Sequence, residues 1–324
     1  MTTTYLGLEL RSPIIVASSP FTADSRSVAR CAEAGAGAVV LKSIFEEQIV
    51  HETAALERGY VSPFGDTDEY LSRYLGDDYK ARFLDLVAAS AATGIPVIGS
   101  INCIGADERW VEYATAMAGA GAAALELNIY FQPTDRHTPA AELERMYVDV
   151  AAKVADAVRV PVAVKLPVRI TNMLHLGDAL LGRGVRGLTL FNRYFEPDVD
   201  IERIAYTSGS PYSSPAELRG VLRPTALASS LLPQLDIAVS TGVHDGEAAV
   251  KALLCGARAV QICTAIRNDG FEAIGRIGEF VDAWAKRQGF RSIEAFRGRL
   301  DFGSSEPGMF HRVQYMRYFP QENN

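Results

Sequence analysis

Lysine and asparagine side chains recur near the ends of apolar runs in this 324-residue chain. Lys42 lies in AGAVVLKS and Lys165 in VPVAVKLP, while Asn102, Asn128 and Asn192 lie in IPVIGSIN, ALELNI and RGLTLFN. An asparagine amide offers both a donor and an acceptor, which suits one edge of a planar ring. A lysine supplies positive charge for an anionic or electron-rich group. Together these residues predict a site for a planar, electron-rich ligand.

Two further runs end in small or hydroxyl-bearing residues just before a predicted helix. Thr241 and Gly242 do so in STGVHDGEAA, and Cys263 and Thr264 do so in QICTAI. Backbone N–H groups at a helix N-terminus favour an anion. In barrel enzymes, the loops after the seventh and eighth strands commonly bind phosphate. These segments therefore predict a phosphate site, and the plainer alternative is that Gly242 only forms a turn.

The elements that must position these residues are short β-rich runs, each followed by an alanine-rich stretch. Most runs are apolar on both faces, as in a parallel sheet covered by helices. Eight such runs lie at 13–18, 36–43, 95–102, 124–129, 160–167, 186–192, 235–242 and 257–264. Helical patterns lie at 27–35, 108–121, 142–158, 176–184 and 246–256. This alternation predicts an α/β fold, a (β/α)8 TIM barrel. An open doubly wound sheet is the rival, and the lack of an early G-x-G-x-x-G disfavours it.

Three segments are longer than ordinary loops. Residues 44–80 follow the second run, residues 193–225 follow the sixth and contain the flexible-looking SGSPYSSP, and residues 301–324 form a C-terminal tail. Long insertions after barrel strands lie on the C-terminal face, where barrel enzymes carry out chemistry. We expect one domain over 1–300 and a tail that packs on the barrel or on a partner subunit.

Composition excludes several classes of protein. The net charge of −7 disfavours a nucleic-acid partner, because no large basic stripe is present. The four cysteines are Cys31, Cys103, Cys255 and Cys263, and they form no C-x-x-C pair. We therefore expect no metal site and no disulfide framework, but free thiols in a reducing cytoplasm. The sequence shows no signal peptide and no membrane span.

These motifs together resemble the dihydroorotate dehydrogenase family, and most closely its soluble class 1 branch. The matching stretches include PIIVASSPF, VVLKS, LELN, VAVKLP, LFN, LRPTALA and GFRSIEAFRGRL, together with STGVHDGEAAVKALLCGARAVQICTAI. The resemblance covers about residues 1–300 and implies an FMN-binding barrel. It assigns the flavin and its phosphate to Ala17, Ser18, Lys42, Asn102, Asn128, Lys165, Asn192, Gly220, Thr241, Gly242, Cys263 and Thr264. A cationic lysine near the flavin's N1/C2 edge stabilises the reduced, anionic form.

The sequence departs from the family at the catalytic base and at the substrate. The family's cysteine base aligns with Phe131, which cannot accept a proton. Cys103 and Tyr130 are the replacement catalytic candidates beside Lys42, and weaker candidates are Asp135, His137 and His51. The family's N-S-M-G-x-x-N loop, which reads orotate, is missing from the segment after the second run. Arg193 replaces the family's serine or threonine, which suggests a different anion or a different mode of carboxylate binding. We expect Asn128, Asn192 and Arg193 to bind the substrate.

The resemblance implies an FMN-dependent oxidoreductase acting on a CH–CH bond, with dihydroorotate, or a similar planar anion, as the small-molecule substrate. One alternative is the same chemistry on a different planar anion. Another is a catalytically idle FMN-binding protein. The resemblance also implies a cytoplasmic homodimer that passes electrons to a small acid such as fumarate.

Overall fold

The computed structural model describes residues 1–45, 79–103, 109–129, 131, 136–193 and 197–300. Eight parallel strands close into a barrel, as the sequence predicts. Their order around the barrel is β3 (Ile14–Val16), β4 (Ala38–Val40), β6 (Val97–Cys103), β7 (Ala124–Ile129), β8 (Val162–Pro167), β9 (Gly187–Asn192), β12 (Asp236–Ser240) and β13 (Ala259–Ile262), and β13 pairs with β3 to close it. A short strand, β5 (Ile44–Phe45), follows β4 and also pairs with β6. Seven of the barrel strands lie within predicted runs, and β6 extends one residue beyond the run at 95–102.

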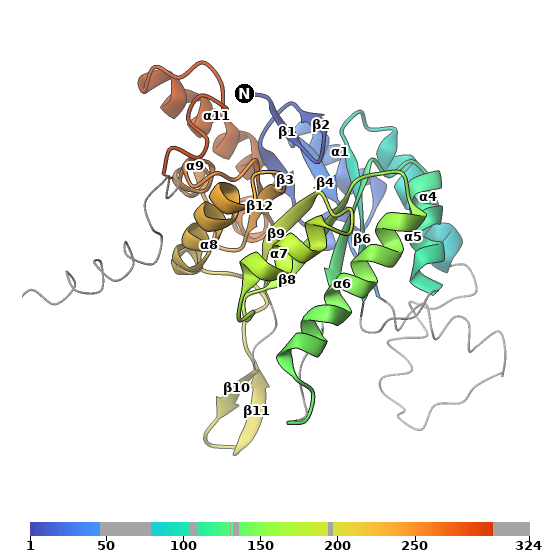
Figure 1. Ribbon diagram of the computed structural model, residues 1–324. Helices are drawn as coiled ribbons and strands as arrows, with labels where there is room; N and C mark the ends of the chain where they lie inside the picture. Colours follow the sequence, from blue (N-terminus) through green and yellow to red (C-terminus); the bar gives the residue numbers. More distant parts are fainter. Residues whose placement is uncertain (46–78, 104–108, 130, 132–135, 194–196, 301–324) are drawn as a thin grey trace, which may run out of the picture.

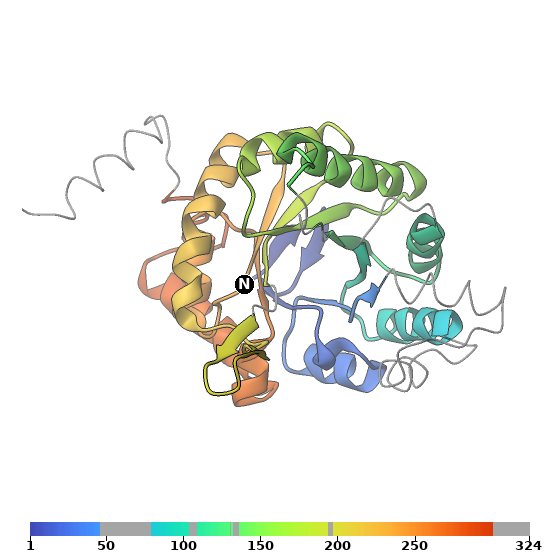
Figure 2. The same ribbon diagram turned by 90° about the horizontal axis from the view of Figure 1, so that it is seen from below.

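Helices surround this barrel, and Figure 2 shows them as an outer ring. The α-helices are α1 (Ser25–Glu33), α4 (Tyr79–Ala91), α5 (Arg109–Gly119), α6 (Ala140–Ala157), α7 (Met173–Leu181), α8 (Leu218–Leu231), α9 (Gly246–Leu254), α10 (Thr264–Asp269) and α11 (Glu272–Arg287). Short 3-10 turns, η1 (Pro20–Thr22) and η2 (Pro215–Glu217), precede α1 and α8. Helices α1, α5, α6, α7 and α9 fall on predicted helical patterns, within a few residues at each end. No helix among the described residues is long and apolar enough to cross a membrane.

Strand alternation divides the core into two apolar clusters. Residues facing outward from the strands, such as Val39 and Leu125, pack against the helices and are fully buried. Inward-facing residues, such as Ile15, Val40 and Ile98, form a smaller cluster inside the barrel. Successive side chains of a strand point to opposite faces, so residues two apart share a face. The inner face is therefore set by every second residue of each run.

An N-terminal hairpin closes one end of the barrel. It consists of β1 (Thr3–Tyr5) and β2 (Leu8–Leu10), joined by a two-residue turn of Leu6 and Gly7, both with positive φ. Turns of this kind match the twist of an antiparallel pair. Tyr5, Leu6 and Leu10 join the inner cluster, and the Leu6 N–H donates to the Asp236 carboxylate at 2.6 Å. The hairpin closes the N-terminal end of the strands and leaves the C-terminal end for the site.

The insertion after β9 contains a second hairpin that the sequence did not predict. It consists of β10 (Pro197–Asp200) and β11 (Ala205–Ser208), and it projects from the barrel end opposite to β1–β2 (Figure 1). Ile201 and Ile204 at its tip are exposed. Most of the predicted insertion after the second strand, and the whole predicted tail 301–324, lie outside the described residues.

Candidate functional site

A cavity of about 150 Å³ opens at the C-terminal ends of the strands. Its walls come from β3, β8, β9, β12 and β13 and from the loops that follow them. The lining residues are Ala17, Ser18, Lys165, Asn192, Arg193, Pro211, Ser213, Ser240, Thr241, Gly242, Val243, Gln261, Cys263 and Thr264. Nine of the sequence-predicted site residues are among them: Ala17, Ser18, Lys165, Asn192, Arg193, Thr241, Gly242, Cys263 and Thr264. Lys42, Asn102, Asn128 and Gly220 are not among the lining residues.

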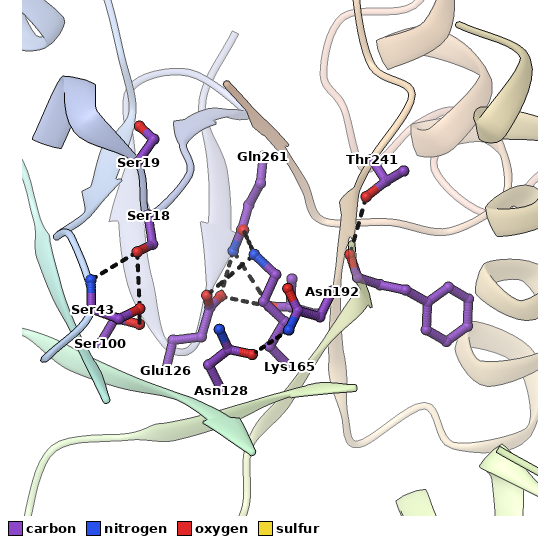
Figure 3. A network of polar contacts seen from close by, with 12 residues as sticks. Ser18, Ser19, Ser43, Ser100, Glu126, Asn128, Lys165, Asn192, Thr241 and Gln261 are labelled. Carbon is purple, nitrogen blue, oxygen red and sulfur yellow. Dashed lines mark hydrogen bonds and ion pairs between the residues drawn. The ribbon is translucent and has the colours of Figure 1, made fainter. Parts of the chain in front are cut away.

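Lys165 is held from below by polar side chains inside the barrel. Its Nζ lies 3.8 Å from Glu126 Oε1 and donates to Gln261 Oε1 at 3.3 Å. Glu126 Oε2 in turn accepts hydrogen bonds from Gln261 Nε2 and from Thr189 Oγ1, the latter at 2.8 Å. Figure 3 shows Glu126, Lys165 and Gln261 converging from β7, β8 and β13. The lysine is therefore a buried cation with a buried counter-ion.

Two of the predicted asparagines form a pair above this network. Asn192 Nδ2 donates to Asn128 Oδ1 at 2.8 Å (Figure 3). Asn128 is the register partner of both Asn102 on β6 and Lys165 on β8. Asn102, Asn128 and Lys165 thus lie at one level on three neighbouring strands, and Asn192 reaches Asn128 from β9. These side chains offer both donors and acceptors at the strand ends, and binding of a planar ring by them stays a prediction.

Three serines connect the first strands below the cavity rim. The Ser18 hydroxyl accepts from the Ser43 N–H at 2.9 Å and lies 3.0 Å from the Ser43 hydroxyl. Ser43 Oγ lies 2.8 Å from Ser100 Oγ, and both residues are buried. These hydrogen bonds orient the Ser18 side chain, which lines the cavity.

Burial changes the acidity of the groups near the rim. Desolvation lowers the pKa of Lys42 from its usual 10.5, and the nearby Cys263 opposes this shift. Burial raises the pKa of the Cys263 thiol, while the charges of Lys165 and Lys42 act in the opposite direction. The Lys42 ammonium also lies 4.8 Å from the centre of the Phe45 ring. Lys42 is therefore at the same end of the barrel as the cavity, although it is not part of the lining.

The turn after β12 has unusual backbone geometry. Thr241 and Gly242 both have φ of +80°, which is uncommon for a β-branched residue. The Thr241 hydroxyl donates to the Phe191 carbonyl at 3.2 Å and holds this conformation. A Cβ atom on Gly242 would lie 2.3 Å from the backbone nitrogen of Leu218. Glycine is therefore required where this turn passes the start of α8.

The loop after β11 folds back over the cavity. Ser213 N–H donates to Thr264 Oγ1 at 3.2 Å, and the Ser213 hydroxyl lies 2.9 Å from His244 Nε2. The Arg267 guanidinium lies 4.0 Å from the centre of the Tyr212 ring. The stretch that reads as flexible in the sequence is thus tied to the ends of β12 and β13.

Arg193 lines the cavity, but its charge is already paired. Its Nε donates to Glu217 Oε2 at 3.0 Å, and its Nη1 donates to the Ser210 carbonyl at 2.7 Å. The other carboxylate oxygen of Glu217 accepts from the Ser214 N–H at 2.7 Å. Arg193 therefore holds the loop after β11 against η2, and binding of a substrate anion by Arg193 stays a prediction.

Other predicted residues lie elsewhere or outside the described part. Gly220 lies on the exposed side of α8, away from the cavity lining. The side chain of Cys103 lies outside the described residues, as do Tyr130, Asp135 and His51. Phe131, at the position of the family's base, packs edge-on against Tyr147 of α6 with ring centres 5.1 Å apart. His137 is exposed.

Sequence reasoning missed Glu126, Gln261, Ser213 and His244. Glu126 lies two residues before Asn128, and Gln261 lies two residues before Cys263, so each shares the inward face of a predicted site residue. Strand alternation was therefore a usable signal for these two. Ser213 and His244 come together only through the fold of the loop, which local patterns do not specify. No cluster of three or more potential metal-ligating residues occurs in the part of the chain that the structure describes.

Comparison with known proteins agrees with this geometry. The family model for dihydroorotate dehydrogenase matches residues 1–283. The chain is 30% identical, over 90% of its length and 93% of the relative's, to the dihydroorotate dehydrogenase B (NAD(+)) catalytic subunit of Methanosarcina acetivorans. It is 29% identical, over 90% and 94% of the two lengths, to a provisionally named dihydroorotate dehydrogenase A (fumarate) of Aeropyrum pernix.

Proposed function

The chain belongs to the dihydroorotate dehydrogenase family of oxidoreductases, and from this premise we propose that it uses FMN to oxidise a CH–CH bond beside a carbonyl group. The observation that carries the proposal is the cavity at the strand ends, with the Lys165 ammonium and the Asn192 amide in its wall. We propose dihydroorotate as the substrate. A related planar anion is the second candidate, because Phe131 and Arg193 replace the residue types that the family resemblance would place there.

The donor set fits FMN in charge and in hydrogen-bonding capacity. Lys165 supplies a cation, and the paired amides of Asn128 and Asn192 supply donors and acceptors for a ring edge. Thr241 and Gly242, ahead of α9, offer backbone N–H groups for a phosphate. Bound FMN would accept the hydride removed from the substrate, which carries both electrons of the oxidation. The protein's own residues would bind and orient the ring and favour its reduced, anionic form.

The proton-accepting residue is proposed separately from the flavin site. Phe131 has no titratable group, so another residue must take the proton that leaves the substrate carbon. Cys103 and Tyr130 remain the candidates, since both follow strand-end asparagines on neighbouring strands. Lys42 has a pKa lowered by burial, and we propose that it lies near the reacting edge as an electrostatic group.

The test is an anaerobic reduction experiment on the purified full chain. We expect a yellow protein with bound FMN whose absorbance near the flavin maximum bleaches when dihydroorotate is added. If bleaching occurs, it is measured again in Cys103→Ala and Tyr130→Phe. The variant that no longer bleaches identifies the proton acceptor. A flavin that stays oxidised with dihydroorotate but is bleached by dithionite would exclude dihydroorotate and leave the related planar anion. A protein that binds no flavin would overturn the whole proposal.

The electron acceptor is tested in the same preparation. The names of the two relatives include NAD(+) and fumarate, respectively, so both compounds are added to the reduced protein and its reoxidation is followed. The homodimer and the cytoplasmic location stay predictions from the resemblance. Sedimentation of the purified chain tests the homodimer.

A further inference from the structure

The barrel interior holds an ion pair that a purely structural core would not need. Glu126 is 1% exposed and Lys165 is 7% exposed, in a barrel whose next inward layer is apolar, with Ala124, Ala163 and Ala259. Removing two charges from water is costly, and replacing a buried pair with apolar residues is often neutral or stabilising. A buried pair of this kind is therefore weak support for stability and calls for another role.

The hydrogen bonds fix the carboxylate and leave the ammonium at the cavity. Glu126 Oε2 accepts from Thr189 and Gln261, whereas Glu126 Oε1 has no hydrogen-bond partner among the described residues and faces Lys165 Nζ at 3.8 Å. Gln261 also accepts from Lys165 through its Oε1 atom. The amide thus spans the two charged groups and keeps both in place (Figure 3).

We propose that Glu126 is a positioning residue that acts as the buried counter-ion of Lys165, and that this pair sets how strongly the cavity wall favours the reduced form of a bound flavin. The inference rests on the proposed function for its flavin part. Lys165 lines the cavity, while Glu126 lies behind it and is not part of the lining. The ammonium attracts a reduced, anionic ring, and the carboxylate behind it weakens that attraction.

The direction of the expected shift in the flavin's reduction potential follows from the positions of the two charges, with Lys165 at the cavity and Glu126 behind it. In Glu126→Gln the carboxylate is removed at nearly constant volume while the ammonium remains, so the reduced flavin gains affinity relative to the oxidised flavin. In Lys165→Met the cation is removed, and the reduced flavin loses affinity. In each variant we expect the ratio of the affinities for reduced and oxidised flavin to change at least tenfold. This change corresponds to a shift of about 30 mV in the reduction potential of a two-electron couple. The Glu126→Gln shift is positive and the Lys165→Met shift is negative.

The flavin experiment measures the reduction potential of the holoprotein and of both variants against a reference dye at pH 7. Asp236→Asn is the control, because Asp236 is a partly buried carboxylate that pairs with a cation, Arg258, as Glu126 does with Lys165, but at the opposite end of the barrel. We expect this control to alter stability and to leave the potential unchanged. A Glu126→Gln potential that equals the wild-type value, or that falls, would overturn the inference.

A second measurement needs no flavin and separates this inference from the proposed function. Urea unfolding of the chain without flavin is compared for Glu126→Gln, Lys165→Met and the double variant. If the two groups are counter-ions, the double variant unfolds at a higher urea midpoint than the sum of the single changes implies. Strictly additive midpoints would overturn the pairing even in a protein that binds FMN. A protein that shows the coupling but binds no flavin would keep the pairing and lose both the flavin part and the proposed function.

Discussion

Gly242→Ala is expected to destabilise the protein through a clash between the turn after β12 and the start of α8. The added Cβ would lie 2.3 Å from Leu218 N, 2.7 Å from Leu218 Cα and 2.9 Å from Leu218 Cβ. Carbon atoms in contact normally lie about 3.5–4.0 Å apart. Leu218 is buried and begins a helix, so relief requires the backbone to move rather than a side chain to rotate. The φ of +80° adds a separate cost.

The magnitude follows from these two contributions. A non-glycine residue in the left-handed region costs about 1–2 kcal/mol, and the more restricted unfolded chain returns about 0.4–1 kcal/mol. Overpacking adds about 1–3 kcal/mol. We therefore expect a loss of about 1–5 kcal/mol in the free energy of unfolding.

Gly289→Ala is the matched control for the backbone contribution alone. Gly289 has φ of +78°, and nothing lies within 4 Å of its Cβ position. Its loss should be no more than about 1.6 kcal/mol, since only the backbone contributions apply. Urea unfolding of both variants measures the difference, and FMN affinity at a temperature where both are folded gives a second readout. Only Gly242→Ala should weaken FMN binding, because Leu218 follows Glu217, which pairs with Arg193 at the cavity. Equal losses for the two variants would refute the clash.

Three further outcomes test the described geometry. Thr241→Gly and Thr241→Ala both lose the hydrogen bond to Phe191, but only glycine relieves the strain of the positive φ. Urea unfolding should therefore find the glycine variant more stable than the alanine variant by up to about 1 kcal/mol. The reverse order would contradict the strained turn. Burial raises the pKa of Cys31 to about 12, so peptide mapping after iodoacetamide at pH 8 should find Cys31 unmodified until urea unfolds the chain. Because burial lowers the pKa of Lys42, the folded state binds fewer protons than the unfolded state between that lowered pKa and 10.5. Stability should rise with pH in this window by at most about 1.4 kcal/mol per unit, and Lys42→Met should flatten the slope.

The strands were predictable from sequence because their burial between the barrel interior and the helices determines their residue types. Runs such as 160–167 are short, rich in valine and apolar on both faces, which together indicate a strand covered on both sides. The ends of these runs also fixed where Lys165 and Asn192 lie. Helix α8 was harder to predict from sequence, because Pro224 lies inside it and proline is disfavoured in helix interiors. Burial of Leu218, Val221 and Ala228 against the core outweighs that local preference.

The site was predictable only where strand geometry determines it. Glu126 follows from the alternation that places Asn128 inward, so a reading of whole strands rather than their ends would have found it. The pairing of Arg193 with Glu217 could not be read in this way. The two residues are 24 positions apart, and the loop between them brings them together through tertiary contacts. The charge of Arg193 predicted an anionic substrate from sequence; the structure shows Glu217 as its partner, and binding of a substrate anion stays a prediction.

The retained and altered parts of the site differ in how strongly the barrel constrains them. Lys165 has partners on β7 and β13, so its loss would leave Glu126 as an uncompensated buried charge. Phe131 lies beyond the end of β7 and needs only an apolar contact with Tyr147. Substitution at such a position disturbs packing but no buried charge. The part of the site proposed to hold the flavin is therefore constrained by buried charges, whereas Phe131 beyond β7 is not. On the proposed function, this difference would let the barrel keep its cofactor while the identity of its substrate differs.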